Sequence, residues 1–391
     1  MLDTLKKIYY RQPELHKKIY EERFNSPFTV HFDFEIKQFN HENSYPAFFY
    51  YDADFALLTE KIYKQFESCL SLIYSLPPVV LHQFALSSII EEVKSTNEIE
   101  GVHSTRRELQ EALEEVQASN RFSSIVKKYN MLLSQTPVQF YTCRDIRTLY
   151  DDFAHKEIVS LNPANKLDGK IFRKSTVDVQ SPTGKILHRG LYPEEKIIES
   201  MAKALNILNE EKIPALIRIA VFHYFFEYIH PFYDGNGRTD RFITSCYIAE
   251  HFHYIMALRL SVTIKKQRST YQKLLNETDS DINMGDLTPF VHGFSQIISR
   301  TFEDIEDILK RKHEQLEKFK EKITSLNPHD EFMQNFYYIL LQESLFLGQG
   351  VSMEELMKLT GKSRNTIKNK IASLPENHII IRGNKKKFYK F

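Results

Sequence analysis

Apolar residues recur at helical spacing along most of the chain, with little of the alternation typical of strands, so the pattern predicts a mainly α-helical protein. One helical run covers residues 81–100 and stops at Gly101, a residue type that commonly ends a helix. Residues 215–229 are apolar on nearly every side, which places that helix in the middle of a core. A further helix is expected from about 237 to 251, and helices continue to about 325.

Two short stretches have a β-prone pattern instead. Residues 28–39 are compatible with a strand. Residues 175–179 and 185–188 flank the turn-forming run Ser181-Pro182-Thr183-Gly184. The second pattern predicts a small β-hairpin in a mostly helical protein.

The last sixty residues predict three helices and a hairpin, the element order of a winged helix-turn-helix. Ser352 begins one helix, Gly361 makes the turn and Ser363 caps the next helix. Two final strands would turn at Gly383-Asn384, and Asn327-Pro328 marks the boundary before this region.

Composition and charge change this picture little. Hydrophobic residues make up 42% and charged residues 26% of the 391 positions, which is typical of a globular protein, and the net charge is +1. Cys69, Cys143 and Cys246 lie far apart without zinc spacing, which favours buried thiols in a reducing compartment. The first eighteen residues contain no apolar core of signal-peptide length and no apolar stretch reaches membrane-spanning length, so we expect a soluble cytoplasmic protein without membrane contacts.

A glycine-bordered loop carries the clearest chemical signal, in the run HPFYDGNGRTDR from His230 to Arg241. Gly235, Asn236 and Gly237 lie where a loop enters a helix, so unpaired backbone N–H groups and the helix dipole favour an anion there. Arg238 and Arg241 share one face of the first turn, where two cations need a polyanion to balance them. The pattern predicts a triphosphate site.

Two further residues complete this loop. Asp234 offers a hard oxygen ligand that suits Mg²⁺ held by one carboxylate plus phosphate oxygens. His230 is a group able to take a proton near neutral pH. Together these parts indicate phosphoryl or nucleotidyl transfer to a hydroxyl. A metallohydrolase using His223, His230 and Asp234 is less favoured, because no HExxH motif accompanies them and His223 reads as a core residue.

The loop resembles the signature of the Fic family, HxFx(D/E)GNGRxxR. Every fixed position is matched, by His230, Phe232, Asp234, Gly235, Asn236, Gly237, Arg238 and Arg241. The resemblance implies a Fic-type helical bundle with a β-hairpin flap that transfers AMP from ATP to a Ser, Thr or Tyr hydroxyl of a protein, including its own chain. We expect three parts, namely an N-terminal helical region at 1–110, a catalytic domain at 111–325 and, from the pattern of the last sixty residues, a winged helix at 330–391.

The resemblance assigns a role to each residue of the loop. His230 would deprotonate the target hydroxyl, and Asp234 would hold Mg²⁺ against the α- and β-phosphates. Asn236 and the backbone of Gly235 and Gly237 would form an anion hole. Arg238 and Arg241 would bind the β- and γ-phosphates.

Other positions match the family less closely. Phe232 would pack the loop onto the core, and the hairpin at 175–188 would align an extended target segment by main-chain pairing. Tyr271 and Asn283 resemble positions near the adenine, although extra residues precede the segment Gly285 to Phe290.

A second motif, Thr96 to Gly101, resembles the inhibitory motif (S/T)xxxE(G/N) of the family. Thr96 and Glu100 share a helix face, and a carboxylate in the last turn opposes the helix dipole unless a cation partners it. The resemblance supplies Arg241 as that partner, which would displace the γ-phosphate contact. A plain surface helix end and a role for Glu100 in removing AMP both stay open.

Positive charge is concentrated at the end of the chain. Residues 361–391 contain nine Lys or Arg and one acid, and Arg364, Asn365, Lys368 and Asn369 are types that contact phosphates and base edges. This favours DNA binding through 361–391 or docking of a protein. A DNA-binding regulator whose Fic domain senses nucleotide, a phosphate donor other than ATP, and a homodimer stay open as alternatives.

Overall fold

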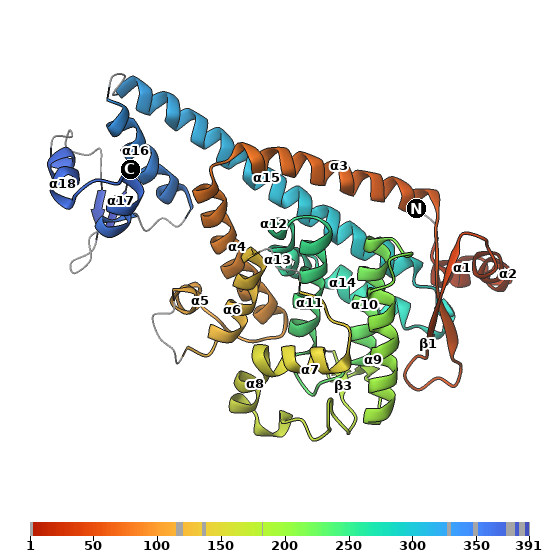
Figure 1. The fold of residues 1–391 in the computed structure, drawn as a ribbon. Helices are drawn as coiled ribbons and strands as arrows, with labels where there is room; N and C mark the ends of the chain where they lie inside the picture. The colour runs from red at the N-terminus through yellow and green to blue at the C-terminus, as the bar shows by residue number, and fades with distance from the viewer. Residues whose placement is uncertain are drawn as a thin grey trace. The chain divides into compact units, whose positions relative to one another are not determined.

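The computed structural model describes residues 3–114, 120–134, 138–181, 183–326, 330–346, 351–372, 380–382 and 388–390. Within these residues the protein is mainly helical (Figure 1). The helices before the predicted loop are α1 (Leu5–Arg11), α2 (Pro13–Phe24), α3 (Ala53–Ser75), α4 (Pro78–Ile99), α5 (Arg106–Leu113), α6 (Ser123–Met131), α7 (Cys143–Tyr150), α8 (Lys156–Leu161), α9 (Glu194–Leu208) and α10 (Ala215–Ile229). Those after it are α11 (Asn236–His251), α12 (Tyr254–Ala257), α13 (Leu260–Lys266), α14 (Arg268–Thr278), α15 (Thr288–Leu326), α16 (Glu331–Phe346), α17 (Met353–Thr360) and α18 (Arg364–Ala372).

Short irregular helices and three small sheets complete the described chain. The irregular helices are η1 (Leu132–Ser134), the π-helical η2 (Asp151–His155), η3 (Pro163–Asn165) and η4 (Asp281–Asn283). The strands are β1 (Thr29–Ile36), β2 (Tyr45–Tyr50), β3 (Asp178–Gln180), β4 (Ile186–Arg189), β5 (Val351–Ser352), β6 (Ile380–Arg382) and β7 (Phe388–Lys390). They pair antiparallel as β1-β2, β3-β4 and β5-β7-β6.

Two compact units divide the described chain by their internal contacts. The first comprises residues 1–66 and 89–302, and the second comprises 67–88 and 303–391. The predicted loop and the predicted inhibitory motif both lie in the first unit. The domain limits 1–110, 111–325 and 330–391 stay a prediction.

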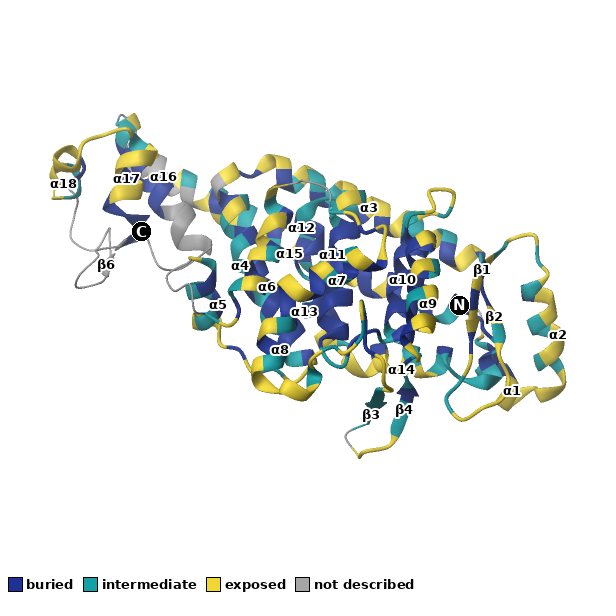
Figure 2. Ribbon diagram, turned by 60° about the horizontal axis from the view of Figure 1, so that its bottom comes forward, coloured by how far each residue is buried: buried dark blue, intermediate teal, exposed yellow. Residues whose placement is uncertain are grey.

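The core of the first unit is built around α10 and α11, which are dark blue over almost their whole length in Figure 2. Of the fifteen residues of α10, thirteen are buried, as its apolar sequence predicts. α11 is buried from Asn236 to Ile248 although its first turn is polar and charged. Burial of charged groups requires partners, so the first turn of α11 has to be paired with groups from other elements.

The N-terminal strands pack beside this core. Residues 28–39 do contain β1, as predicted, but its partner β2 was not expected from the sequence. β2 also pairs with the segment before α15: Phe48 N donates to Gly285 O at 3.1 Å, and Leu287 N donates to Phe48 O at 2.8 Å. Asp286, in the same segment before α15, forms a buried ion pair with Arg23 at 3.1 Å.

Several local predictions are confirmed. The β3–β4 hairpin forms, although β3 begins at Asp178 rather than at 175. α4 is followed by Gly101 at φ +74°, and Ser352 and Glu355 form a reciprocal capping box at the start of α17. The three cysteines are buried and free. Among the described residues no helix is long and apolar enough to cross a bilayer. Predictions at Pro182, at Asn327-Pro328 and at Gly383-Asn384 lie outside the described residues.

Candidate active site

His230 lies at the end of α10, where the backbone turns into the left-handed region at φ +52°. This conformation is uncommon for a residue other than glycine, so other groups have to hold it. The buried guanidinium of Arg173 does so: its Nε donates to His230 O at 2.9 Å and its Nη2 to Ile229 O at 3.4 Å. A cation is also electrostatically favoured at these final carbonyl groups of the helix.

The imidazole of His230 is held in the tautomer that leaves Nε2 without a proton. Nδ1 lies 3.2 Å from the backbone oxygen of Glu227, and a carbonyl oxygen can only accept, so Nδ1 carries the hydrogen. Burial lowers the pKa of His230 to about 3, and the positive charges of His188 and Arg173 act in the same direction. The ring is therefore neutral near pH 7, with a lone pair on Nε2 that can accept a proton.

The loop after His230 is fixed by packing and by one amide. The ring of Phe232 is fully buried and stacks on Tyr150 at a centroid distance of 3.8 Å, as expected for a residue that packs the loop onto the core. Asn236 Oδ1 accepts from Phe232 N, and Asn236 Nδ2 donates to Phe232 O, both at 2.8 Å. The Asn236 side chain thus ties the loop to itself through one amide hydrogen, and the second hydrogen of Nδ2 is a donor in addition to the backbone N–H groups of this turn.

Two glycines shape the start of α11 for different reasons. Gly235 has φ +83°, in the left-handed region that favours glycine. Gly237 has ordinary helical geometry, but a Cβ there would collide with the Glu100 carboxylate and the Arg241 guanidinium. An anionic group therefore lies directly on the backbone at the N-terminus of α11, which is the place where the dipole and free N–H groups favour one.

That anionic group is fixed by Arg241. Arg241 Nε donates to Thr96 Oγ1 at 2.8 Å, and its Nη2 donates to Thr96 O at 3.2 Å and to Glu100 Oε1 at 2.6 Å. Burial opposes ionisation of Glu100, but the charge of Arg241 outweighs it and lowers the pKa of the carboxyl. The predicted motif residues Thr96 and Glu100 are thus in contact with Arg241, as an ion pair with one member almost fully buried.

The other loop arginine has a different partner. Arg238 Nη1 donates to Glu157 Oε2 at 2.6 Å, and both side chains are buried. Nearby, Asp234 is half-buried; its Oδ1 accepts from Gly235 N at 2.5 Å, and Asn165 Nδ2 lies 3.4 Å from its Oδ2. In the described part of the chain no three His, Cys, Asp or Glu side chains gather as a metal site. One carboxylate beside the start of α11 has the donor chemistry of Mg²⁺ sites in which phosphate and water supply the remaining ligands.

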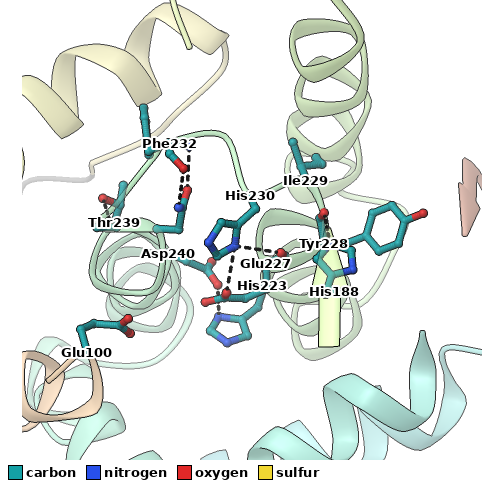
Figure 3. Close-up of polar contacts among 12 residues, drawn as sticks. Glu100, His188, His223, Glu227, Tyr228, Ile229, His230, Phe232, Thr239 and Asp240 are labelled. Carbon is teal, nitrogen blue, oxygen red and sulfur yellow. Dashed lines mark hydrogen bonds and ion pairs between the residues drawn. The ribbon is translucent and has the colours of Figure 1, made fainter. Parts of the chain in front are cut away.

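His223 is a core residue, as predicted. Its Nδ1 lies 2.9 Å from Thr244 Oγ1 and from Asp240 Oδ2, and its Nε2 lies 2.8 Å from the hydroxyl of Tyr271. The close-up in Figure 3 shows the contact between Asp240 and His223 beside the separate contact of His230 with Glu227. Burial lowers the pKa of His223 to about 3, so this histidine is a neutral structural link.

The sequence model of the Fic/DOC family matches residues 141–248, which include the whole loop. Residues 141–248 are a Fic/DOC family domain. A curated relative, Protein adenylyltransferase Fic of Nematostella vectensis, is 30% identical over 112 residues. These cover 27% of this chain and 24% of the relative, so the chain spans about a quarter of the length of the curated relative it matches.

Two solved structures are similar to this chain at low sequence identity. A Fic family protein from Desulfovibrio desulfuricans G20 is 17% identical, with 84% of this chain and 95% of that chain covered at a TM-score of 0.49. A Fic domain containing signaling protein from Bacteroides thetaiotaomicron is 20% identical, with 64% and 97% covered at a TM-score of 0.46.

Tyr271 and Asn283, expected near an adenine, have their polar groups bonded within the protein. The Tyr271 hydroxyl lies against His223, and Asn283 Nδ2 donates to the carbonyl oxygens of Thr278 and Asp286. A cavity of about 120 Å³ lies between α14, α10 and the β3–β4 hairpin. Neither Tyr271 nor Asn283 lines it. Its lining includes Val179, Leu187, Glu227, Gln272, Leu275 and Asn276.

Sequence reasoning missed several residues that shape the Fic domain's site. Arg173, Glu157 and His188 come from segments remote from the loop in sequence, and none belongs to a motif that marks it. Both ring nitrogens of His188 have acceptors, Asp279 Oδ2 at 3.1 Å and Tyr228 O at 2.6 Å. Burial acts to lower the pKa of His188, but Asp279 outweighs it and raises that pKa. His188 thus anchors β4 as a cation.

Proposed function

We propose that this protein is an adenylyltransferase, which moves AMP from ATP to a Ser, Thr or Tyr hydroxyl of a protein. One observation carries the proposal: a carboxylate rests on Gly237 at the N-terminus of α11, paired with Arg241 and close to a neutral histidine. The carboxylate of Glu100 stands in for a phosphate of ATP. The site is therefore built for an anionic group beside a proton acceptor.

The transfer step follows from these positions. The target hydroxyl gives its proton to His230 Nε2 while its oxygen attacks the α-phosphorus of ATP. The bond from that phosphorus to the bridging oxygen of the β-phosphate breaks, and pyrophosphate leaves. Arg238, Arg241 and the backbone N–H groups at the start of α11 bind the phosphates and offset the charge that develops on the leaving group. Asp234 would hold Mg²⁺, which supplies further charge neutralisation when bound.

Both substrates would lie beside the β3–β4 hairpin. We place the adenine in the cavity between α14 and the β3–β4 hairpin, because its lining is largely apolar and it reaches Glu227, one turn before His230. The exposed backbone of the β3–β4 hairpin offers main-chain pairing to an extended target segment.

Glu100 restrains the reaction in this proposal. Its carboxylate and a γ-phosphate would compete for Arg241 and for the space over Gly237. Since the Glu100 side chain is 28% exposed at a helix end, displacing it does not require the core to open. Removal of AMP by water activated at Glu100 stays an alternative, which incubation of adenylylated target with the wild-type protein would reveal as release of AMP.

Labelled ATP tests the reaction class. Protein carrying Glu100→Gly should incorporate label from ATP labelled at the α-phosphate, and not from ATP labelled at the γ-phosphate. Incorporation of the γ-label would instead identify a kinase reaction. Incorporation of neither label into any added protein or into the chain itself would contradict the proposal.

The transfer activity should stay constant as the pH falls through the usual pKa range of histidine. Because the pKa of His230 is lowered to about 3, the imidazole stays unprotonated and competent as a base when the pH falls from 8 to 5.5. We expect kcat of the Glu100→Gly protein at saturating MgATP to show no step near pH 6.5. A loss of activity with a midpoint near pH 6.5 that only substitutions of His230 remove would contradict this.

A second function, binding of duplex DNA, is favoured by the end of the chain. α16, α17 and α18 with the sheet β5-β7-β6 have the element order of a winged helix. On α18 the apolar Ile367 is buried, whereas Arg364, Asn365, Lys368 and Asn369 are exposed. These four residues share one face, since they are spaced i, i+1, i+4 and i+5. Arginine and lysine suit phosphates or guanine, and asparagine suits adenine.

Charge reversal on α18 tests this surface. The double variant Arg364→Glu/Lys368→Glu should weaken binding of the full chain to duplex DNA by about tenfold or more and reduce the salt dependence by about two units of slope. Fluorescence anisotropy at several salt concentrations measures both. The double variant Lys17→Glu/Lys18→Glu on α2, at two exposed positions with the same charge change, is the matched control. Absence of DNA binding by the wild type at low salt would leave docking of a protein as the role of this face.

A further inference from the structure

One continuous segment, residues 150–158, contacts the loop from His230 to Arg241 at three points. The three contacts share this segment on one side and the loop on the other: the ring of Tyr150 stacks on Phe232 at 3.8 Å, Ile158 packs where a Cβ on Gly235 would lie, and Glu157 accepts from Arg238 at 2.6 Å. We refer to residues 150–158 as the loop support. A segment with this many contacts sets where the loop side chains point.

The two glutamate–arginine pairs of the site differ in how freely their acids can leave. Glu100 directly follows α4, its side chain is 28% exposed, and the next residue, Gly101, has a left-handed backbone. Glu157 lies within the loop support, and its side chain is 6% exposed. A buried charge cannot be moved into water without reorganising its surroundings. The Glu157 pair is therefore a fixed part of the site, whereas the Glu100 pair is replaceable.

Arg238 retains an unused donor in spite of this pair. Glu157 accepts only from Nη1, and the buried Nε–H of Arg238 has no hydrogen-bond partner among the described residues. An unpaired buried donor is costly, and a phosphate oxygen would satisfy it. The guanidinium is thus held at one end by Glu157, with a donor left for an anion.

The helix geometry explains how Glu157 reaches Arg238. The π-helical η2 immediately precedes α8, and its wider turn adds a residue relative to an α-helix. Each added residue rotates the following helix by about 100°. The rotation decides that Glu157 and Ile158, rather than their neighbours, face the loop.

We infer that Glu157 is a positioning residue for the triphosphate: it orients Arg238 for phosphate binding, the opposite of the restraint exerted by Glu100. This inference rests on the proposed function and deepens it. The two acids should then have opposite effects. Loss of Glu100 increases binding of MgATP, and loss of Glu157 decreases it.

A double-mutant cycle in the Glu100→Gly background tests the inference. Calorimetry compares MgATP binding by the parent, Glu157→Ala, Arg238→Ala and the combination of both. Glu157→Ala should weaken MgATP binding on the order of tenfold, because one charge-assisted contact is misplaced. On top of Arg238→Ala it should add no more than about twofold, because it acts through that arginine. AMP binding, which needs neither outer phosphate, should stay unchanged.

Further variants separate positioning from folding. Glu157→Gln keeps an oxygen that accepts from Arg238 and should recover most of the lost binding. If Glu157→Ala lowers the thermal unfolding temperature so far that binding is not measurable, Glu157→Met, of similar volume, replaces it in the cycle. Glu250→Ala, at an exposed position on the same α11, is the matched control and should bind MgATP like the parent.

The outcomes distinguish this inference from the function on which it rests. A parent Glu100→Gly protein that binds no MgATP would overturn the proposed function and this inference with it. A parent that binds MgATP, together with equal binding by Glu157→Ala, losses that add to those of Arg238→Ala, or an equal loss of AMP binding, would overturn the role of Glu157 alone.

Discussion

Replacing Glu100 by glycine should raise the rate of AMP incorporation into protein on the order of 10- to 100-fold over the wild type. In the wild type Arg241 Nη2 donates to Glu100 Oε1 at 2.6 Å, so ATP has to displace a charge-assisted hydrogen bond before its outer phosphate reaches Arg241. Contacts of this kind contribute about 1.5–3 kcal/mol, which corresponds to that range of rates. Incorporation of α-labelled ATP under identical conditions measures the ratio.

Glu98→Gly is the matched control for this activation. Glu98 lies in the last turn of α4, two residues before Glu100, and pairs with Lys265 and Lys94 rather than with the loop. A glycine at either position weakens the helix end to a similar degree. If Glu98→Gly activated as strongly as Glu100→Gly, loosening of the helix would account for the effect and the competition for Arg241 would be excluded.

Loss of His230 in the Glu100→Gly background should reduce AMP transfer by about 10²- to 10⁴-fold, the usual contribution of a positioned general base. His230 Nε2 is the unprotonated nitrogen of a ring whose Nδ1 is bound to Glu227 O. MgATP binding should be retained, since the phosphate contacts come from α11. Single-turnover incorporation together with calorimetry separates the two effects.

The choice of variant matters because His230 has φ +52°. Asparagine adopts this left-handed conformation more readily than alanine, so His230→Asn preserves the loop while removing the base. His230→Ala provides the comparison. Transfer by His230→Asn within tenfold of the parent would show that another group takes the proton.

The loop could be predicted from the sequence because all of its parts are contiguous. Glycines before a helix, two arginines one turn apart and a histidine at the preceding helix end define an anion site without knowledge of the fold. α10 was predictable for a related reason, since a run of fifteen residues without a polar face has to be buried. The pairing of Glu100 with Arg241 joins residues 141 positions apart, and only the family resemblance pointed to it.

Residues that contact the loop but lie far from it in the sequence could not be predicted. Arg173 and Glu157 are charged residues in unremarkable local sequence, and only the packing of three segments buries them against α10 and α11. β2 was missed because the run Tyr45–Tyr50 is aromatic and apolar throughout, without the alternation that marks a strand, and because its partners include Asp286, far along the chain. The contact of the Tyr271 hydroxyl with the buried His223 was not predictable either, because the two residues lie 48 positions apart.

Calorimetry of MgATP binding to the Glu100→Gly protein tests most directly whether the N-terminus of α11 is a nucleotide site. We predict saturable binding of ATP that requires Mg²⁺, that is much weaker in the wild type, and that Arg238→Ala reduces. An absence of Mg²⁺-dependent ATP binding by the Glu100→Gly protein would contradict the account.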